Sequence, residues 1–422
     1  MKYSGVEWIG EIPENWKLNK IGQLFNLRNE KVSDKDYSPL SVSKGGIVPQ
    51  MENVAKSDAS DDRKLVLKGD FAINSRSDRK MSCGVSPLDG SVSLINTILY
   101  PKNDDVIYND YMNYLLKNYG FAEEFYRWGH GIVADLWTTK WQEMKSIMLP
   151  LPSVQKQKAT YDFLNQKNAE IDSLIEIENK QIEKLKEYKQ AVITEIVTRG
   201  LDKNVPLKDS GVEWIGKIPE NWSIKRAKFI AEEFIKGSGI TKEDVVIDGD
   251  IPCVRYGEIY TKYDNYFNEC ATRTNLSNVP SPTFIEKGDL LFTCTGELVE
   301  EIGKNVLYLG EEKCLAGGDI IVMKHKQHPG FINYAMNCTR SQMQKSYGKA
   351  KLKVVHISTL GIGNIYVCLP PYAEQKNISD YLDDFTESIN EIISIKQQKI
   401  CQLDEYKKSL IYEYVTGKKE VR

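Results

Sequence analysis

The residues best suited to chemistry in this chain are basic, and they gather in short polar segments. The 422 residues include 56 Lys and Arg against 59 Asp and Glu, so the formal net charge is −3. The chain therefore lacks the global positive field that would attract nucleic acid at long range. Residues 320–373, however, contain no Asp or Glu and carry seven Lys or Arg and three His. This stretch is the first candidate surface for an anionic partner.

The densest part of that stretch, KSYGKAKLK at residues 345–353, begins at the end of an amphipathic helix expected near residues 330–347. The first half has RWGHGIVADLWTTK at residues 127–140 in the equivalent place, and Gly129 and Gly348 both follow the expected helix. One interpretation is a phosphate-contacting loop in which glycine lets the backbone approach closely. The other is a solvated basic face in which glycine ends the helix. The candidate residues here are His130, Lys140, Lys345, Lys349, Lys351 and Lys353.

A second candidate segment, NSRSDRK at residues 74–80, follows the expected strand GDFAI. Its side chains suit hydrogen bonds to base edges and phosphates, and Arg can bind guanine through two bonds; an ordinary polar hairpin is the alternative. The matching segment TCTGE at residues 293–297 is not basic, so RYGEIYTKY at residues 255–263 would replace it. SVSKGG at residues 41–46 is weaker, because it also suits a plain turn. The candidate residues are Lys44, Asn74, Ser75, Arg76, Arg79, Lys80, Arg255, Tyr256 and Lys262.

No catalytic centre and no cofactor are predicted. LPPY at residues 369–372 is similar to a motif of DNA amino-methyltransferases, but the residue that holds the amino group there is Leu369 here, which forms no side-chain hydrogen bond. Asp135, Glu143 and Lys145 match the Asp…Glu-x-Lys pattern of some nuclease centres. Glu-x-Lys, however, arises readily by chance in a chain with 27% charged residues. We therefore expect a protein that is not itself an enzyme.

The cysteines and the apolar runs limit the remaining classes. No two of the eight Cys are closer than 17 residues, so there is no CxxC pair and structural zinc is not predicted. Scattered thiols suit a reducing cytoplasm better than a disulfide framework. The first residues lack the apolar core of a signal peptide, and no apolar run reaches the roughly 18 residues of a membrane span.

The elements that must position these residues come from an internal repeat. SGVEWIGEIPENW at residues 4–16 returns as SGVEWIGKIPENW at residues 210–222, with 12 of 13 positions identical. Residues 151–198 align without gaps on residues 369–416. The offsets of the two pairs are 206 and 218, so the chain consists of two tandem copies, the second of which is about 12 residues longer.

Each late segment predicts one long helix with a coiled-coil seam. Apolar residues recur every three or four positions, as in Leu164, Ile171, Ile175 and Ile182 and in their counterparts Leu382, Ile389, Ile393 and Ile400. Further apolar residues lie off this seam. They would pack against the neighbouring domains or form a docking surface for partner subunits. The candidate partner-binding residues are Leu174, Ile177, Tyr188, Ile392, Ile395 and Tyr406.

The segments between these boundaries, about residues 17–150 and 223–368, predict mixed α/β structure in which strands dominate. Each also holds one amphipathic helix, near residues 110–127 and 330–347. The fold class we expect is α+β, with two tandem α/β domains separated by two long antiparallel coiled-coil helices and related by pseudo-twofold symmetry. This symmetry would bring Ser4 near the end of the second long helix at Thr416.

The layout and its boundary signatures, GVEWIG.IPENW, LP…QK…L and ITEIVTRGLD, resemble the DNA-specificity (S) subunit of type I restriction–modification enzymes. The resemblance covers the whole chain and is strongest at the repeat boundaries. It implies a first target-recognition domain at 1–150, a central helical spacer at 151–200, a second target-recognition domain at 201–368 and a C-terminal helical spacer at 369–422. The alternative is a coiled-coil scaffold that binds proteins and no DNA; the acid-free stretch argues against it.

The resemblance also implies a function and a set of partners. Each target-recognition domain would read one half of a bipartite, asymmetric site in double-stranded DNA. The helices would hold two methyltransferase (modification) subunits and, through the complex, the restriction or translocase subunits. Methyl transfer and cleavage would lie on those other subunits.

Overall fold

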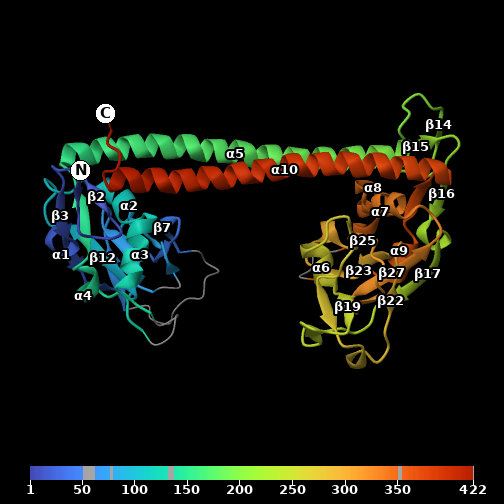
Figure 1. Ribbon diagram of the computed structural model, residues 1–422, viewed down its shortest axis with the longest axis horizontal. Coiled ribbons are helices and arrows are strands. Elements are labelled where there is room, and N and C mark those ends of the chain that lie inside the picture. Colours follow the sequence, from blue (N-terminus) through green and yellow to red (C-terminus); the bar gives the residue numbers. More distant parts are fainter. Residues whose placement is uncertain (51–61, 77–78, 132–136, 350–353, 422) are drawn as a thin grey trace. The chain divides into compact units, whose positions relative to one another are not determined.

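The computed structural model describes residues 1–50, 62–76, 79–131, 137–349 and 354–421. It consists of two compact units. Unit 1 comprises residues 1–179 and 397–422, and unit 2 comprises residues 180–396. Each unit contains an α/β domain together with parts of the two long helices, α5 (Val154–Arg199) and α10 (Tyr372–Val415) (Figure 1). The expected α+β class with two long helices is confirmed.

The ends of the long helices follow from local chemistry. Ser153 precedes α5 and its Oγ accepts a hydrogen bond from the backbone N of Lys156 at 3.4 Å, as an N-cap residue does. Gly200 and Gly417 follow the two helices with φ of 80° and 74°, a left-handed conformation that favours glycine. The predicted seam is largely buried between these ends, with the lowest exposures at the following residues: Leu164, Ile171, Ile182, Leu382, Ile389, Ile393 and Leu410.

The long helices pack antiparallel within each unit. In unit 1 Lys407 donates to Asp172 at 2.6 Å, and the rings of Phe163 and Tyr414 lie 4.7 Å apart. In unit 2 Lys189 donates to Asn390 at 2.9 Å. Residue numbers rise along α5 as they fall along α10, so the expected antiparallel pairing is confirmed in both units.

Unit 1 is built on antiparallel strands. Its four-stranded sheet has the order β10-β9-β12-β4, and a three-stranded sheet has the order β11-β8-β5. Their bounds are β4 (Phe25–Arg28), β5 (Lys31–Val32), β8 (Arg63–Val66), β9 (Phe71–Asn74), β10 (Cys83–Val85), β11 (Gly90–Ser93) and β12 (Asn96–Pro101). The other elements are α1 (Ile21–Leu24), β6 (Leu40–Ser43), β7 (Gly46–Pro49), α2 (Met112–Leu115), α3 (Tyr119–Arg127) and α4 (Trp141–Met144).

Unit 2 has two mixed five-stranded sheets, in the orders β17-β27-β23-β25-β20 and β18-β21-β19-β26-β22. The first sheet comprises β17 (Ala231–Lys236), β20 (Tyr266–Phe267), β23 (Leu290–Thr293), β25 (Asn305–Tyr308) and β27 (Ile320–His325). The second comprises β18 (Val245–Val246), β19 (Ile251–Val254), β21 (Thr272–Thr274), β22 (Phe284–Ile285) and β26 (Cys314–Ala316). The helices are α6 (Tyr256–Thr261), α7 (Pro329–Asn337), α8 (Thr339–Ser346) and α9 (Thr359–Gly363).

The two amphipathic helices expected near residues 110–127 and 330–347 are each interrupted. In unit 1 the helical turn α2 ends before Asn118, whose side chain accepts from Phe121 N at 3.0 Å and starts α3 anew. In unit 2 Cys338 adopts an extended conformation, with φ −68° and ψ 158°, between α7 and α8. In unit 1 side-chain capping therefore divides a helix that hydrophobic periodicity alone joins, whereas in unit 2 Cys338 makes no side-chain cap hydrogen bond and its extended backbone marks the break.

Equivalent elements open and close the α/β domain of each unit. In unit 1 β3 (Lys17–Lys20) pairs antiparallel with β13 (Met148–Leu151), and in unit 2 β16 (Ser223–Arg226) pairs with β29 (Tyr366–Leu369). The registers correspond, because Lys17 opposes Leu151 where Ser223 opposes Leu369. The sheet order β4-β12-β9-β10 likewise corresponds to β17-β27-β23-β25. The sequence repeat is thus also a structural repeat.

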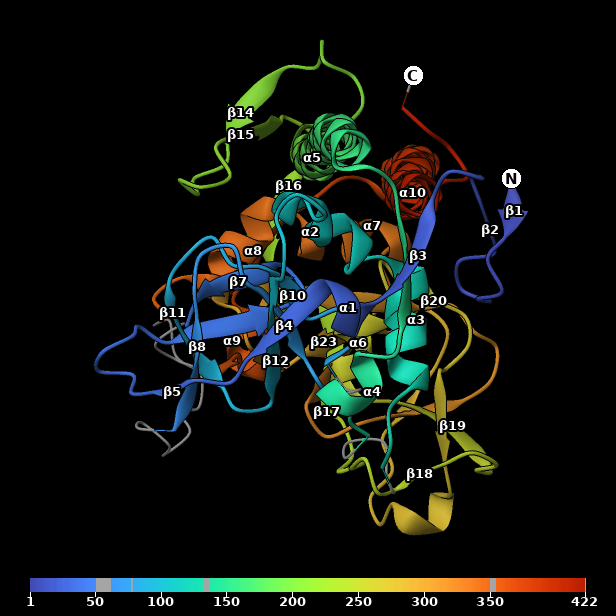
Figure 2. The same cartoon turned by 90° about the vertical axis from the view of Figure 1, so that its left-hand side faces the viewer.

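The duplicated opening motif forms a small hairpin against the end of a long helix. In unit 1 β1 (Lys2–Tyr3) pairs with β2 (Glu11–Ile12), and in unit 2 β14 (Leu207–Asp209) pairs with β15 (Lys217–Pro219). Tyr412 of α10 donates to the carbonyl of Trp8 at 2.7 Å, and Lys418 donates to that of Ile9 at 2.6 Å. The two termini consequently lie close together (Figures 1 and 2). The expected approach of the first motif to the end of the second helix is confirmed.

Candidate nucleic-acid interface

Two of the predicted segments of unit 1 meet at the end of strand β9. Thr139 N donates to the carbonyl of Ser75 at 3.0 Å, and Arg76 forms a β-bridge with Thr138. Thr138 and His130 in turn exchange two backbone hydrogen bonds of 3.0 and 3.1 Å. The described parts of segments 74–80 and 127–140, which no sequence pattern links, therefore form one loop surface.

The side chains of this loop surface differ in accessibility. Arg76 and Arg79 are exposed, and the backbone N of Arg76 is held by Asn74 Oδ1 at 3.0 Å. Lys80 pairs with Glu123, and its ammonium lies 5.2 Å from the centre of the Tyr126 ring. A small cavity of about 20 Å³ lies beneath the loop between these residues and Trp137. The two arginines are thus more exposed than Lys80, which is half-buried.

Four other predicted residues of unit 1 have different surroundings. Ser75 is 6% exposed and shares a 3.0 Å hydrogen bond with Thr97 Oγ1, so it supports the loop rather than facing solvent. Lys44 is exposed in the turn between β6 and β7, which confirms the plain turn as its local structure. His130 and Lys140 are exposed, and Lys140 directly precedes α4.

Gly129 does not have the role suggested by its place after the helix. A Cβ at Gly129 would come within 2.4 Å of the Trp137 indole nitrogen, so glycine is required there by internal packing. Gly348 has φ 70° and open space around it, as expected of a residue that ends a helix. The two glycines therefore differ in the reason for their presence.

Three segments meet in unit 2 at the end of strand β23. Thr295 and Gly296 pair with His356 and Val355, and Thr295 Oγ1 lies 3.1 Å from His356 Nδ1. Tyr260 of α6 joins them, because its hydroxyl lies 2.7 Å from Thr293 Oγ1. The TCTGE segment, the RYGEIYTKY segment and the segment after α8 thus form the counterpart of the loop surface in unit 1.

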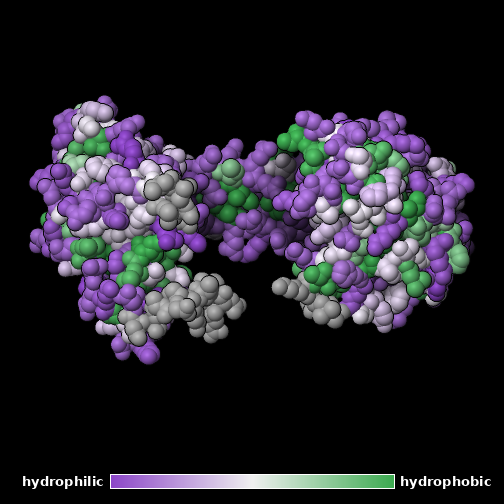
Figure 3. Space-filling view, turned by 90° about the horizontal axis from the view of Figure 1, so that it is seen from below, coloured by the Kyte–Doolittle hydropathy of each residue, from purple (hydrophilic) through white to green (hydrophobic). Residues whose placement is uncertain are grey.

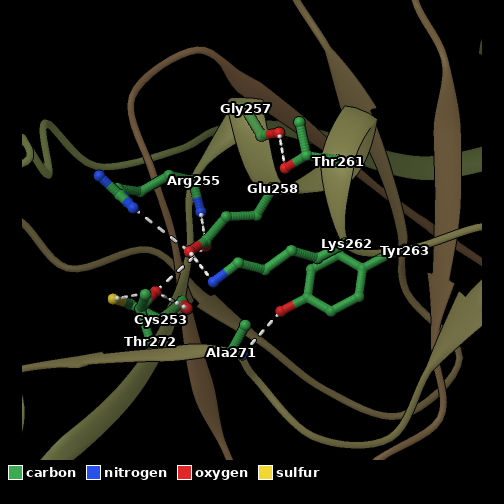
Figure 4. Close-up of polar contacts among 9 residues, drawn as sticks. All are labelled: Cys253, Arg255, Gly257, Glu258, Thr261, Lys262, Tyr263, Ala271 and Thr272. Atoms are coloured by element: carbon green, nitrogen blue, oxygen red, sulfur yellow. Dashed lines mark hydrogen bonds and ion pairs between the residues drawn. The ribbon is translucent and has the colours of Figure 1, made fainter. Parts of the chain in front are cut away.

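A buried carboxylate organises the RYGEIYTKY segment, and sequence reasoning missed it. Glu258 is 3% exposed. Its Oε2 accepts from Arg255 N at 2.9 Å and from Thr272 Oγ1 at 3.1 Å, while its Oε1 lies 3.3 Å from Arg255 Nη2 and 3.5 Å from Lys262 Nζ (Figure 4). Two candidate residues, Arg255 and Lys262, thus share this buried partner, and the third, Tyr256, follows Arg255 in the sequence. The signal was an acidic residue three positions after Arg255 at a helix start.

The position of Lys345 shows that one of the sequence-based predictions is wrong. It was expected to contact phosphate, but it is 1% exposed and donates to the Gly303 carbonyl at 2.7 Å and to Asn305 Oδ1 at 3.1 Å. Burial lowers the pKa of this lysine from 10.5 to about 7. A side chain enclosed in this way presents no group to a duplex, so Lys345 belongs to the interior of unit 2.

The basic character of residues 320–373 is also smaller than the sequence suggests. Lys324 pairs with Asp289 at 3.0 Å, and Lys326 pairs with Glu232. Both acids come from segments outside the acid-free stretch. Lys349 is half-buried and donates to the His356 carbonyl. Lys351 and Lys353, like Asp135 in unit 1, lie outside the described residues.

The off-seam apolar residues of the long helices are exposed. Their exposed fractions range from 42% at Ile392 to 64% at Ile395. The others are Leu174, Ile177, Tyr188 and Tyr406. Figure 3 shows one face of the molecule, on which hydrophobic patches interrupt a largely hydrophilic surface, including that of the long helices. Contiguous exposed apolar patches are typical of binding surfaces.

The described residues hold no group of three or more His, Cys, Asp or Glu placed to bind a metal ion. Within the same residues, no helix is both long and apolar enough to cross a membrane.

Comparisons with known proteins agree with this arrangement. A family model, the type I restriction modification DNA specificity domain, matches residues 219–402. A protein of Methanocaldococcus jannaschii inferred to be the type I restriction enzyme MjaX specificity subunit is 24% identical over 443 residues, which cover 98% of this chain and 96% of that protein. The MjaVIII specificity subunit of the same organism is 24% identical over 287 residues, or 66% of this chain and 63% of that protein.

Solved structures show the same fold at low identity. A chain from a study of complex assembly and conformational transition of the type I R-M system aligns with a TM-score of 0.69 and 12% identity. The HsdS subunit from Thermoanaerobacter tengcongensis aligns with a TM-score of 0.50 and 13% identity. Each alignment covers 96% of this chain and 98% of the other.

The alternative of a scaffold without DNA recognition fails against these findings. The family model covers most of unit 2, and the relatives and folds extend the similarity over nearly the whole chain. Over nearly its whole length the chain is therefore similar to DNA-specificity subunits of type I restriction–modification systems, and residues 219–402 match the DNA specificity domain of these systems.

Proposed function

We propose that this specificity subunit reads a bipartite, asymmetric site in double-stranded DNA, with one half-site for each unit. One observation carries the proposal. Equivalent strands, β9 and β23, end in loop surfaces whose sequences and donor groups differ. A symmetric protein presents two like readers to DNA, whereas two copies of one fold with unlike loops present two unlike readers. The two half-sites should therefore differ in sequence and be separated by unread base pairs.

The residues proposed to contact DNA are the accessible members of the two loop surfaces. In unit 1 they are Asn74, Arg76, Arg79, Lys80, His130 and Lys140, and Lys44 in the turn between β6 and β7 is proposed in addition. In unit 2 they are Arg255, Tyr256, Lys262 and Lys349, with Lys351 and Lys353 proposed from the sequence alone. Arg76 and Arg255 are proposed to read bases, because arginine offers two parallel donors to guanine. The lysines would contact phosphates, which give affinity without sequence information.

The test is a map of methylated positions in cells that express this chain with its methyltransferase partner. The expected result is one motif with two different half-sites and a fixed gap of unspecified bases. A continuous motif, or a palindrome with identical halves, would overturn the proposal. The domain limits 1–150 and 201–368 are tested in the same assay, because exchanging either range for that of a relative should change one half-site only.

We further propose that the six exposed apolar residues of the long helices hold two methyltransferase subunits, and through them the restriction subunits. Pseudo-equivalent residues, such as Leu174 and Ile392, lie in both copies of the helix, so the surface occurs twice. Ile177→Lys should reduce co-purification of the methyltransferase subunit about tenfold, since interface centres tolerate charge poorly. Lys184→Glu, on the exposed surface of the same helix, is the control. Unchanged capture by the Ile177 variant would remove the helices from the interface.

The complex is proposed to act in the cytoplasm, where bacterial and archaeal DNA lies. Free cysteines are consistent with that reducing compartment, because all eight are unpaired in the structure.

A further inference from the structure

Arg255 and Lys262 form a charged cluster whose negative member is buried. One carboxylate, Glu258, faces two cations, so the cluster keeps an excess positive charge. The side chains of Arg255 and Lys262 are 26% and 45% exposed, whereas that of Glu258 is 4% exposed. The excess charge is therefore presented to solvent, while the carboxylate that positions it is buried.

The arginine is held more firmly than a surface arginine usually is. Its backbone N donates to Glu258, and its guanidinium is within 3.3 Å of the same carboxylate. A Cβ at Gly317 would come within 3.3 Å of Arg255 Cα and 3.6 Å of its Cγ, so the stem of the arginine lies on a glycine surface. Its Nε is buried with no hydrogen-bond partner among the described residues, so Glu258 satisfies only part of the guanidinium.

The carboxylate is in turn fixed to the sheet. Thr272, on strand β21, lies opposite Cys253 of β19, and its hydroxyl is 3.1 Å from Glu258 Oε2 and 3.0 Å from the Cys253 carbonyl. A hydroxyl has one proton, so it alternates between these two acceptors. Through Thr272 the position of the two cations is set by the second sheet of unit 2 rather than by the loop alone (Figure 4).

We propose that Glu258 is a specificity-determining positioning residue for the second half-site. Its buried carboxylate holds Arg255 and Lys262 in a fixed orientation as a two-cation reader, and Glu258 itself does not touch DNA. The inference rests on the proposed function, because it presumes that the RYGEIYTKY segment reads DNA. A neutral residue could also cap the start of α6, but it could not hold two cations of like charge 3.3 and 3.5 Å from one oxygen.

Because of this role, a substitution of Glu258 should change DNA specificity and non-specific DNA affinity in different ways. Glu258→Gln keeps the shape and the acceptor for Arg255 N, but removes the charge that orders the cations. Discrimination at one or two base pairs of the second half-site should fall about tenfold, the effect of losing one oriented contact. Binding to a duplex of random sequence should stay equal or increase, since the cluster becomes more positive. The first half-site should not change.

The experiment uses the full chain co-expressed with its methyltransferase partner. The methylated motif gives the specificity, and a fluorescent random-sequence duplex gives non-specific affinity. Asp289→Asn is the matched control, because Asp289 is another buried carboxylate of unit 2 that pairs with a lysine, Lys324, at 3.0 Å. It should lower the melting temperature and leave both half-sites as they are. If Asp289→Asn relaxes the second half-site in the same way, the role assigned to Glu258 is wrong.

Two further variants separate the possible outcomes. A double Ala substitution of Arg255 and Lys262 tests the proposed function: an unchanged motif would show that this segment reads no DNA. If the double variant relaxes the second half-site but folded Glu258→Gln retains the wild-type motif, only the positioning role fails. Should Glu258→Gln be insoluble, Thr272→Val decides, because it removes one hydrogen bond and no charge. It should relax the same base pairs to a smaller extent, and an unchanged motif would overturn the inference.

Discussion

The two units are alike where they frame the recognition domain and unlike where that domain ends in loops. In both, a buried glutamine near the start of a long helix binds the recognition domain. Gln157 accepts from Tyr108 N at 2.8 Å and Gln375 accepts from His328 N at 3.0 Å. Each also donates to a proline carbonyl, at 3.0 and 2.9 Å. The boundary signature LP…QK…L thus corresponds to the same hydrogen-bond arrangement in both units. We call this arrangement, around Gln157 in unit 1 and Gln375 in unit 2, the glutamine clamp.

The turns before equivalent strands show the same agreement. Gly69 and Gly288 have φ of 93° and 97°, and the next residues, Asp70 and Asp289, each accept a 2.9 Å hydrogen bond from the backbone three positions earlier. The loops at the far ends of those strands differ in charge, length and source. Unit 1 presents arginines directly after β9, whereas unit 2 takes its cations from α6. The two units therefore share the strands that end in loop surfaces, but the exposed cations at those surfaces come from different elements.

The largest effect should come from removing the tryptophan of the opening motif. Trp222 is 1% exposed, and Gly200 after α5 lies against its ring. Trp222→Ala should lower the free energy of unfolding by about 3–5 kcal/mol, as large cavities in cores do. Equilibrium denaturation measures the loss. Trp16→Ala should cost a similar amount in unit 1, and a loss under about 1 kcal/mol in either would contradict the shared frame.

A milder pair of variants sharpens the same comparison. Trp16 Nε1 donates to Glu420 at 3.0 Å, whereas Trp222 Nε1 is buried without a partner among the described residues. Phenylalanine at position 16 should therefore cost about 1 kcal/mol more than phenylalanine at position 222, because only the first loses a hydrogen bond. Equal costs would show that Glu420 contributes nothing to this contact.

The second-largest effect is a pH dependence confined to unit 2. Lys345 has its pKa lowered to about 7 by burial, whereas an unfolded lysine titrates near 10.5. As pH falls from 9 to 7 the unfolded chain is already protonated and the folded chain is not, so the unfolded state is favoured. The free energy of unfolding should fall by about 2 kcal/mol over this range. Lys345→Met should remove this slope, and Lys349→Met, which retains Lys345, should keep it. An identical slope in wild type and Lys345→Met would refute the assignment.

The clamps predict a third effect of intermediate size. Gln157→Leu and Gln375→Leu each leave buried donors and acceptors without partners, which costs about 1–3 kcal/mol. Because the two clamps share their geometry, the two losses should agree within about 1 kcal/mol. Thermal unfolding of both variants checks this, with Gln166→Leu on the exposed face of α5 as the control.

Sequence patterns could predict the frame because its signals are local or repeated. The seam of α5 and α10 is a periodicity, and the opening motif is a duplication, so both are visible without knowing the fold. Most segments of the two loop surfaces were also predicted, from their Arg, Lys and Gly content, but TCTGE at residues 293–297 was set aside because it is not basic. That Arg76 meets Thr138, and Thr295 meets His356, could not be found in this way, because each pairing joins residues 61 or more positions apart.

Lys345 shows most directly what sequence patterns could not predict. It lies in TRSQMQKS, a helix so polar that periodicity gives it no buried face. Its burial comes from Gly303, where a Cβ would come within 3.1 Å of the lysine stem, and from the ring of Phe292. Both neighbours are supplied by other segments of unit 2. Glu258 was missed for the opposite reason: its partners, Arg255 and Lys262, are adjacent, but its depth is set by Thr272 on a strand.

The next prediction concerns Arg76 of unit 1, which is proposed to contact DNA. Arg76→Ala should weaken binding to the specific site by about 1–3 kcal/mol and relax one half-site only. Lys68→Ala, an exposed cation near the turn before β9, should leave the motif unchanged. Methylated-motif mapping and a mobility shift on the mapped site measure the two quantities. If both half-sites persist and affinity holds, Arg76 is an ordinary surface residue.

The smallest effect is expected from circular permutation, in which the two termini are joined and the chain is opened at a new place. Both termini lie in unit 1, where Lys418 contacts Ile9 and Glu420 contacts Trp16, so a short Gly-rich linker can join them without displacing either. The equivalent connection in unit 2 is residues 201–206, which follow α5 and are largely exposed. A chain that begins within this segment therefore keeps both hairpins, both clamps and both helices. Exposed loops of this kind tolerate new termini.

The permuted protein should fold, assemble with the methyltransferase and methylate the same motif, with a melting temperature within a few degrees of wild type. Opening the chain inside α6, at Gly257, is the control and should abolish the second half-site. A permuted chain that is insoluble when opened at 201–206 would show that the two hairpins are not equivalent ends of one repeat.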